Sequence, residues 1–405
     1  MRNVFCLLCL VMTIPLLSPP VLAGECRPVA TDPPNARDQE PQFPHQARAC
    51  EKKTNVPLKV EVLAEGLEHP WAVEVLDDDE GLLVTERAGR LRHVSPDGKL
   101  SEPIQGLPEV FAQGQGGLLD VIADDDFDDN RRIYWSFSEP REGGNTTAVA
   151  RGTLSRDYAR VEDVEIIFRA EPVYDGDKHF GSRLLIDDDD DHLYITLGER
   201  SDMPMREYAQ RLDSHLGSVL RVTTDGKPAR GNPFMNRQDA KPEIWSYGHR
   251  NIQAAAFDDD ERLWVIEHGA NGGDELNLVK KGANYGWPRV AYGIEYSGEP
   301  IRGAVTHKEG FEPPVYYWDP VIGPSGALFH DGDMFEEWED DLLIGGLVAT
   351  GIVRLDIRNR KVVGEERLLT ERGRRIRDIA EGDDGELYVV TDEANGQLWK
   401  VTRGR

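Results

Sequence analysis

The chain has no apolar run that could cross a membrane after its first residues. Its one extended apolar stretch, residues 4–17, follows Arg2 and leads to a small-residue site that ends at Ala23. A basic residue, a short apolar core and a small-residue site in this order are typical of a secretory signal peptide. The core is too short for a transmembrane helix. We therefore expect residues 1–23 to be a signal peptide, and the mature protein to be periplasmic or secreted with no integral membrane segment.

Cysteine is scarce, with four residues in 405, and two of these lie in the predicted signal peptide. Cys26 and Cys50 remain, and a pair of thiols in an oxidising compartment favours a disulfide. Such a bond would organise residues 24–56 as an N-terminal extension, and its loop-entropy contribution would be roughly 3 kcal/mol. Residues 57–405 then form the main domain.

Basic residues are also fewer than acidic ones. The chain has 47 Lys and Arg against 74 Asp and Glu, which gives a formal net charge of −27. A surface of this sign repels nucleic acid and anionic lipid, so we exclude nucleic acid as a partner. Many of the acids stand in short runs, and we interpret these runs as solvated turns rather than metal sites, because Asp side chains cap turn backbones.

Sustained amphipathic helical periodicity is absent, and a strand repeat takes its place. A short apolar strand, an acidic turn and a second strand rich in Val, Leu, Ile, Tyr and Trp recur six times, beginning near Trp71, Leu118, Arg183, Ile252, Ala327 and Ile379. The intervening chain leaves room for two more strands per copy. This pattern predicts an all-β, six-bladed β-propeller of four-stranded antiparallel blades. Residues 58–63 are expected to pair with residues 397–401, which would cover otherwise exposed edge strands.

The repeat also predicts which residues share a face. If each acidic turn joins the first and second strands of a blade, residues before a first strand or after a second strand lie at the opposite end. Those positions are Gln115, His179, Arg183, Glu199, Arg250, Asn251, Gly269, Ala270, Pro324, Ser325, Arg375 and Arg377. Burying several arginines around a channel is costly unless an anion neutralises them. We therefore predict a site for an anionic ligand there.

Five motifs on these loops carry a resemblance to a known family. They are H-F-G-S-R-L from His179, G-H-R-N from Gly248, G-G-D-E-L-N from Gly272, N-Y-G-W-P from Asn284 and R-I-R-D from Arg375. Taken together, between about Val62 and Val401, they resemble the PQQ-dependent soluble aldose sugar dehydrogenases of the glucose/sorbosone dehydrogenase family. The resemblance implies a quinoprotein that binds pyrroloquinoline quinone (PQQ) and Ca²⁺ and oxidises the C1 hydroxyl of aldoses to lactones.

The resemblance also implies residue roles. His179 would be the general base for the C1 hydroxyl as hydride passes to the quinone, with Glu199 orienting its ring and Arg250 completing the catalytic group. The residues that would hold PQQ are Gln115, Arg250, Asn251, Tyr296, Pro324, Arg375 and Arg377. The calcium ligands would be backbone carbonyls: Gly269 and Ala270 for one ion, Glu275 and Tyr285 for a second, structural ion. Arginine forks suit the carboxylates of PQQ, and a histidine suits proton removal near neutral pH.

Two positions depart from the family pattern. Lys178 stands where glucose-specialised members carry an acid, and Val348 lies where a cofactor-binding lysine is expected. Two other functions stay open: a Ca²⁺-dependent, lactonase-like hydrolase, which needs a metal ringed by side-chain carboxylates and amides, and a non-catalytic binding propeller that has lost its cofactor. The implied partners are an aldose and an external electron acceptor such as a quinone, dye or cytochrome. We expect a monomer or homodimer. The sequon at Asn145 matters only in a host that glycosylates exported proteins.

Overall fold

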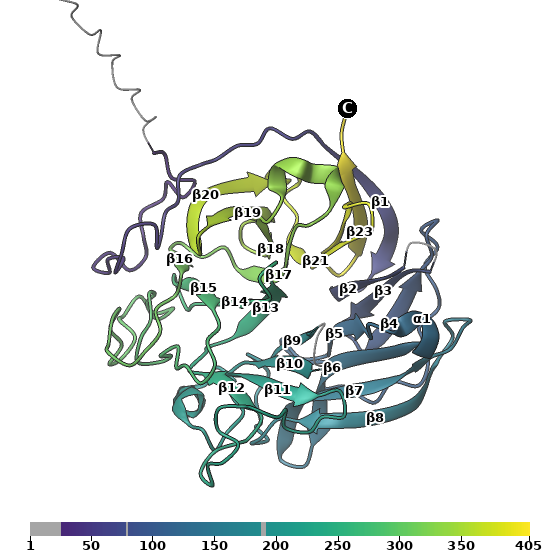
Figure 1. Ribbon diagram of the computed structural model, residues 1–405, viewed down its shortest axis with the longest axis horizontal. Coiled ribbons are helices and arrows are strands. Elements are labelled where there is room, and N and C mark those ends of the chain that lie inside the picture. Colours follow the sequence, from purple (N-terminus) through teal and green to yellow (C-terminus); the bar gives the residue numbers. More distant parts are fainter. Residues whose placement is uncertain (1–25, 78–79, 188–191) are drawn as a thin grey trace, which may run out of the picture.

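Six antiparallel β-sheets surround a central axis in the computed structural model, which describes residues 26–77, 80–187 and 192–405 (Figure 1). The innermost strands β2, β5, β9, β13, β17 and β21 each contact the innermost strands of both neighbouring sheets. The sheets therefore form a closed ring, and the predicted six-bladed β-propeller is confirmed. The predicted signal peptide lies outside the described residues.

The blades follow the chain, and each starts with its innermost strand. Blade one has β2 (Pro70–Asp77), β3 (Gly81–Glu86) and β4 (Arg90–Val94). Blade two has β5 (Leu118–Ala123), β6 (Arg132–Arg141), β7 (Gly144–Leu154) and β8 (Val161–Arg169). Blade three has β9 (Gly181–Ile186), β10 (His192–Leu197), β11 (Ser218–Thr223) and β12 (Ile244–Tyr247). Blade four has β13 (Ile252–Phe257), β14 (Leu263–Glu267), β15 (Asp274–Leu278) and β16 (Tyr316–Trp318).

Blade five has β17 (Pro324–Phe329), β18 (Leu342–Gly346), β19 (Gly351–Arg358) and β20 (Lys361–Leu368). Blade six has β21 (Ile376–Glu381), β22 (Leu387–Thr391) and β23 (Gly396–Arg403), with β1 (Leu58–Leu67) outside them. The helical segments are short: α1 (Phe127–Asn130), α2 (Met203–Arg206), η1 (Glu207–Gln210), η2 (Asp333–Trp338) and η3 (Thr370–Arg372). Within the described ranges, no helix has the length and apolar character needed to span a bilayer.

Blade one is smaller than the others. Its sheet has three strands in the described part of the chain, and beyond β4 a single bridge joins Val94 to Leu100. The other five sheets have the four strands that the repeat predicts.

The acidic turn of blade four shows why the repeat favours aspartate. Asp258 Oδ1 accepts hydrogen bonds from the backbone N–H groups of Asp260 and Arg262, at 3.2 and 3.0 Å. The Asp258 side chain thereby satisfies donors that the tight turn leaves unpaired. At this turn the carboxylate serves the backbone, as the sequence analysis predicted.

The core lies between the blades. Each of the six interfaces between neighbouring blades holds its own apolar cluster. Trp135, Trp264, Trp338 and Trp399 are among the largest fully buried side chains. Complete burial of a large apolar side chain contributes about 1.5–3 kcal/mol, so the sheets are held face to face and the axis is left to polar groups.

The first strand and the last strand of the propeller close the ring. β1 pairs antiparallel with β23, with Val60 opposite Val401 and Val62 opposite Trp399. The C-terminal strand thus lies beside the strand that begins the domain (Figure 1). The predicted pairing of residues 58–63 with residues 397–401 is confirmed.

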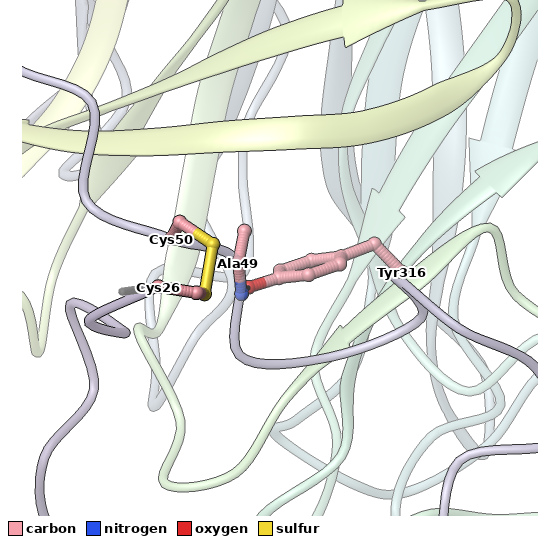
Figure 2. The surroundings of a disulfide bond; sticks show 4 residues. All are labelled: Cys26, Ala49, Cys50 and Tyr316. Carbon is pink, nitrogen blue, oxygen red and sulfur yellow. Dashed lines mark hydrogen bonds between the residues drawn. A yellow bond between two sulfur atoms is a disulfide. The ribbon is translucent and has the colours of Figure 1, made fainter. Parts of the chain in front are cut away.

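The N-terminal extension is fixed to blades four and five. The predicted Cys26–Cys50 disulfide is present, and beside it the Ala49 N–H donates to the Tyr316 hydroxyl at 2.8 Å (Figure 2). Tyr316 in turn donates to Glu365 Oε2 at 2.9 Å, which joins the extension to β20. The extension therefore packs on the outside of the ring before the chain enters β1.

Candidate functional site

A cavity of about 360 Å³ opens at the channel end away from the acidic turns. All six blades contribute to its wall, through Trp71 and Arg87, Gln115 and Leu119, Phe180 and Gly181, Gln253, His268 and Gly269, Gly323 and Val348, and Arg375, Arg377 and Asp392. The predicted positions that line it are Gln115, Gly269, Ala270, Tyr296, Arg375 and Arg377. The positional rule drawn from the repeat thus brings together residues that are up to 262 positions apart (377 − 115) in the sequence.

Two arginines from blade six share one carboxylate in this cavity. The Nη2 atoms of Arg375 and Arg377 lie 2.9 and 2.8 Å from Asp392 Oδ2. Burial acts to raise the pKa of Asp392, but the Arg377 and Arg375 guanidiniums outweigh it and hold that pKa well below its usual range. Asp392 is therefore ionised, and it fixes both guanidiniums at the cavity wall.

His179 immediately precedes the lining residues Phe180 and Gly181 but does not itself line the cavity. Its Nδ1 is 3.3 Å from Glu199 Oε1, and its backbone N–H donates to Gln115 Oε1 at 2.8 Å. Burial, and next the positive charge of Arg250, lower the pKa of His179. The imidazole is thus neutral under conditions where an exposed histidine would be partly protonated.

Glu199 is completely buried beside this imidazole. Its carboxylate also accepts hydrogen bonds from Trp287 Nε1, at 3.1 Å, and from the Ser201 backbone N–H. Burial would raise the pKa of Glu199, yet His179 and Arg250 keep it below its usual value. A carboxylate held in this way can orient a histidine and stabilise its protonated form.

Arg250 lies between this pair and the glycine-rich loop, residues 268–273, which joins β14 to β15. Its Nη1 donates to the carbonyls of His268 and Gly269, at 3.1 and 2.5 Å, and its guanidinium lies 5.1 Å from the centre of the Trp287 ring. Asn251, the next residue, is buried, and its Oδ1 accepts from the Gly181 N–H at 3.2 Å. Neither Arg250 nor Asn251 lines the main cavity.

A second, smaller hollow lies on the other side of the glycine-rich loop. Its lining includes Arg250 and all four predicted calcium ligands, Gly269, Ala270, Glu275 and Tyr285. Burial, followed by the charge of Glu267, raises the pKa of Glu275 well above its usual value. In the described residues no cluster of three or more His, Cys, Asp or Glu side chains could hold a metal. A cation at this loop would therefore depend on carbonyl oxygens, which hard cations accept.

Three predicted positions lie elsewhere. Ser325 is buried, its Oγ donates to the Ile376 carbonyl at 2.7 Å, and it does not line the cavity. Pro324 does not line the cavity: Gly323 takes that place, and the Pro324 carbonyl accepts from His268 Nε2 at 2.7 Å. Arg183 does not reach the mouth, because its guanidinium lies deeper in the channel, between Asp120 and Asp378, at 2.8 and 3.1 Å. These two buried carboxylates neutralise Arg183 without any ligand.

Among the cavity residues that the sequence analysis did not name are Arg87, His268 and Asp392. Each directly follows the second strand of its blade, so the same positional rule, applied at every blade, would have found them. Trp287 does not follow the second strand of a blade, so the positional rule does not find it. It belongs to the long connection between β15 and β16, which folds back against Glu199.

The fold and this cavity define a six-bladed propeller with a ligand site at one mouth of its central channel. A sequence profile of the glucose/sorbosone dehydrogenase family matches residues 67–400, and the chain belongs to this family. The family membership predicted from the motifs is confirmed, and with it the class of an oxidoreductase of the sugar dehydrogenase type.

Three relatives place the chain within this family. Aldose sugar dehydrogenase YliI of Escherichia coli is 44% identical over 350 residues, which are 85% of this chain and 93% of that protein. The crystal structure of the soluble aldose sugar dehydrogenase of E. coli in its apo form has a TM-score of 0.83 and 43% identity, covering 86% of this chain and 100% of that one. The PQQ-bound form of aldose sugar dehydrogenase from Streptomyces coelicolor has a TM-score of 0.69 and 27% identity, covering 85% and 99%.

Proposed function

We propose that the protein is a PQQ- and Ca²⁺-dependent aldose sugar dehydrogenase that oxidises the C1 hydroxyl of an aldose to a lactone. The observation that carries the proposal is one cavity with Arg375, Arg377 and Gln115 in its wall, and a buried His179–Glu199 pair whose histidine is hydrogen-bonded to Gln115. The PQQ-bound relative from S. coelicolor supports the same cofactor.

The residues of the cavity fit an anion with several carboxylates. Three arginines line it, Arg87, Arg375 and Arg377, against two carboxylates, Asp274 and Asp392. In the part of the chain that the structure describes, the buried Nε atoms of Arg250 and Arg377 have no hydrogen-bond partner. Guanidinium groups with donors to spare are suited to bidentate binding of carboxylates.

The glycine-rich loop fits the cation that would accompany such an anion. A Cβ added to Gly269 would meet the Gly272 carbonyl oxygen at 2.3 Å, so only glycine permits this backbone path. Carbonyl oxygens of the loop are hard ligands of the kind that Ca²⁺ prefers. We assign Gly269 and Ala270 to the ion beside PQQ, and Glu275 and Tyr285 to a second, structural ion.

His179 is the base in this proposal. When bound, PQQ supplies a quinone that accepts hydride from C1 of the sugar. Because Nδ1 of His179 faces Glu199, Nε2 is the ring nitrogen that takes the proton of the C1 hydroxyl. Glu199 stabilises the resulting imidazolium, and Arg250 disfavours protonation before the sugar arrives. General base catalysis of this kind contributes about 10²–10⁴-fold.

The remaining binding roles follow from position. Gln115, Tyr296, Arg375 and Arg377 line the cavity and would hold PQQ there. Arg250 and Asn251 act from behind the wall, where they hold the loops on either side. We propose no role for the Pro324 side chain.

The proposal extends to the partners and the location of the protein. An external quinone, dye or cytochrome takes the electrons, and the enzyme is a monomer or homodimer. Residues 1–23 direct export to the periplasm or medium, residues 24–56 are the disulfide-bonded extension, and residues 57–405 are the catalytic propeller.

Dye reduction tests this function. Purified protein reconstituted with PQQ and CaCl₂ should reduce an artificial electron acceptor when an aldose is added, and removal of Ca²⁺ by a chelator should abolish the reaction. His179→Ala should lower kcat by about 10²–10⁴-fold while PQQ still binds. Hydrolysis of lactones without dye reduction by any aldose would instead identify a lactonase-like hydrolase, and an undiminished kcat in His179→Ala would remove His179 as the base.

A further inference from the structure

The loop that carries His179 has a constrained backbone. His179 itself has φ of +49°, and Arg200 and Ser201, in the segment packed against it, have φ of +73° and +72°. Side chains other than glycine rarely adopt this left-handed conformation, which costs about 1–3 kcal/mol unless surrounding contacts enforce it. The two segments touch: the Arg200 N–H donates to the His179 carbonyl at 3.3 Å, and a Cβ on Gly198 would meet that same oxygen at 2.3 Å.

The Arg200 side chain packs against this loop and hydrogen-bonds to its backbone. Its Nε donates to the Lys178 carbonyl at 3.0 Å, and its Nη2 donates to the Gly176 carbonyl at 2.6 Å. The guanidinium also lies 4.1 Å from the centre of the Phe180 ring. Arg200 therefore contacts the residue before His179, the residue after it and the turn that leads into it.

Asn145 completes the arrangement from blade two. Its Oδ1 accepts from Arg200 Nη2 at 2.7 Å, and its Nδ2 donates to the Gly176 carbonyl at 2.9 Å. Asn145 begins the sequon noted in the sequence, but its side chain is fully buried and engaged inside the protein. The residue thus serves this network rather than a glycan.

Burial of this guanidinium is otherwise unfavourable. Arg200 is 2% exposed, and its hydrogen bonds within the described residues go to carbonyl and amide oxygens, which return less electrostatic energy than a carboxylate would. Burial accordingly lowers the pKa of Arg200 to about 10. A buried cation without a hydrogen-bonded carboxylate is a costly way to fold a loop unless the position of that loop matters.

We infer that Arg200, anchored by Asn145, is a positioning residue that holds the His179 loop so that the imidazole faces both Glu199 and the sugar. The inference rests on the proposed role of His179 as the base. A displacement of a reacting group by about 1 Å can cost about 10²-fold in rate. Weakening the contacts of Arg200 with the His179 loop should therefore lower kcat and leave binding of the sugar and of PQQ almost unchanged.

Arg200→Lys tests the inference, because lysine keeps the charge but cannot hold several oxygens in one plane. We expect kcat to fall by about 10–100-fold, with KM and the Kd for PQQ within about threefold of wild type. Asn145→Ala, a milder change, should give a smaller loss of kcat of the same kind. Arg354→Lys is the matched control, since Arg354 is 1% exposed but pairs with carboxylates in blade five, and its kcat should stay within about twofold.

A second readout needs no activity. NMR titration of imidazole signals in cofactor-free protein, with His179 assigned by a His179→Gln variant, reports the His179 pKa directly. Its charged neighbours, Arg250, Glu199 and Arg206, are unchanged in Arg200→Lys, so a rise of that pKa towards about 6.5 would report a displaced, more hydrated ring.

An unchanged kcat, an unchanged His179 pKa or an equal loss in Arg354→Lys would each overturn the inference. If the wild-type enzyme oxidised no aldose, the proposed function would fail, while the titration would still decide whether Arg200 positions His179. If Arg200→Lys did not fold, Asn145→Ala would decide by the same two measurements.

Discussion

At the residue scale, the chemistry of the site depends on how burial and charge set the protonation states of His179 and Glu199. Both groups are buried, yet one stays neutral and the other ionised, because Arg250 opposes a charge on the histidine and favours one on the glutamate. A base prepared in this way keeps its function in mildly acid solution.

This pair predicts a pH profile. Since the pKa of His179 is lowered, the acid limb of kcat should lie below about pH 6.5, with full activity above it. Glu199→Gln removes the charge that favours imidazolium, so the limb should move to still lower pH while the plateau falls by more than tenfold. Glu243→Gln is the matched control, because Glu243 lies 3.3 Å from His215 in a similar pair outside the cavity. An acid limb that stays in place in Glu199→Gln would contradict the account.

A second prediction concerns Glu74 in the channel. Burial, reinforced by Asp120 and Asp378, raises its pKa from near 4.5 to about 8. The folded state therefore binds this proton more tightly than the unfolded state, so stability should fall as pH rises from about 4.5 to about 8. Glu74→Gln, which keeps an acceptor for the Ala123 N–H, should be more stable than wild type at pH 8 and similar at pH 4.5. Urea unfolding at both pH values measures the free energy of unfolding, and Glu102→Gln, a change at an exposed position, should alter it at neither pH. If the free energy of unfolding of Glu74→Gln fell between pH 4.5 and 8 by as much as that of wild type, the assignment would be refuted.

The sequence predicted individual site residues where strand position determines them. Gln115 and Arg375 precede innermost strands and Arg377 is the second residue of β21, and the repeat alone predicts that they lie at the mouth of the channel. Arg183 shows the limit of this rule: it lies two positions inside β9, and its side chain pairs with buried carboxylates of blades two and six deeper in the channel. Those partners come from distant parts of the chain, so no local sequence pattern predicts them.

At the element scale, the extension and the outer strands of blades four and five stabilise each other. Tyr316 is 1% exposed and its hydroxyl joins Ala49 to Glu365, so its hydrogen bonds replace water on three groups at once. Strand boundaries in the repeat were predictable because apolar runs and acidic turns alternate. The route of the extension was not, because it depends on contacts such as the one between Ala49 and Tyr316.

Tyr316→Phe should destabilise the protein by about 1–3 kcal/mol, because it leaves a buried N–H and a buried carboxylate without the partner they have in the wild type. Tyr317→Phe, next along β16, is the matched control, since the Tyr317 ring stacks on Tyr292 at 4.3 Å and keeps that contact without its hydroxyl. Chemical denaturation of the three proteins measures the difference. Equal stability of Tyr316→Phe and Tyr317→Phe would show that the hydroxyl does not secure the extension.

At the scale of the whole molecule, closure of the ring places equivalent positions of the repeated blades around one cavity. Residues near the starts of the first strands or the ends of the second strands of all six blades converge on one cavity. This architecture followed from the sequence because each blade repeats the same local pattern. The long connection between β15 and β16, which brings Trp287 and Tyr296 to the site, interrupts the repeat, so only the family resemblance pointed to these residues before the structure placed them.

The central claim is that this cavity binds PQQ through arginines of blade six, with a cation at the glycine-rich loop. Equilibrium titration of cofactor-free protein with PQQ tests it directly. We predict one PQQ per chain in the presence of Ca²⁺, and affinity at least about 100-fold weaker in Arg375→Gln/Arg377→Gln/Asp392→Asn, where no carboxylate is left unpaired. Arg374→Gln, which removes an exposed ion pair with Glu393 on the same segment, should bind as wild type does. Failure of the wild-type protein to bind PQQ with Ca²⁺ present, or equal affinity in the triple variant, would contradict the account.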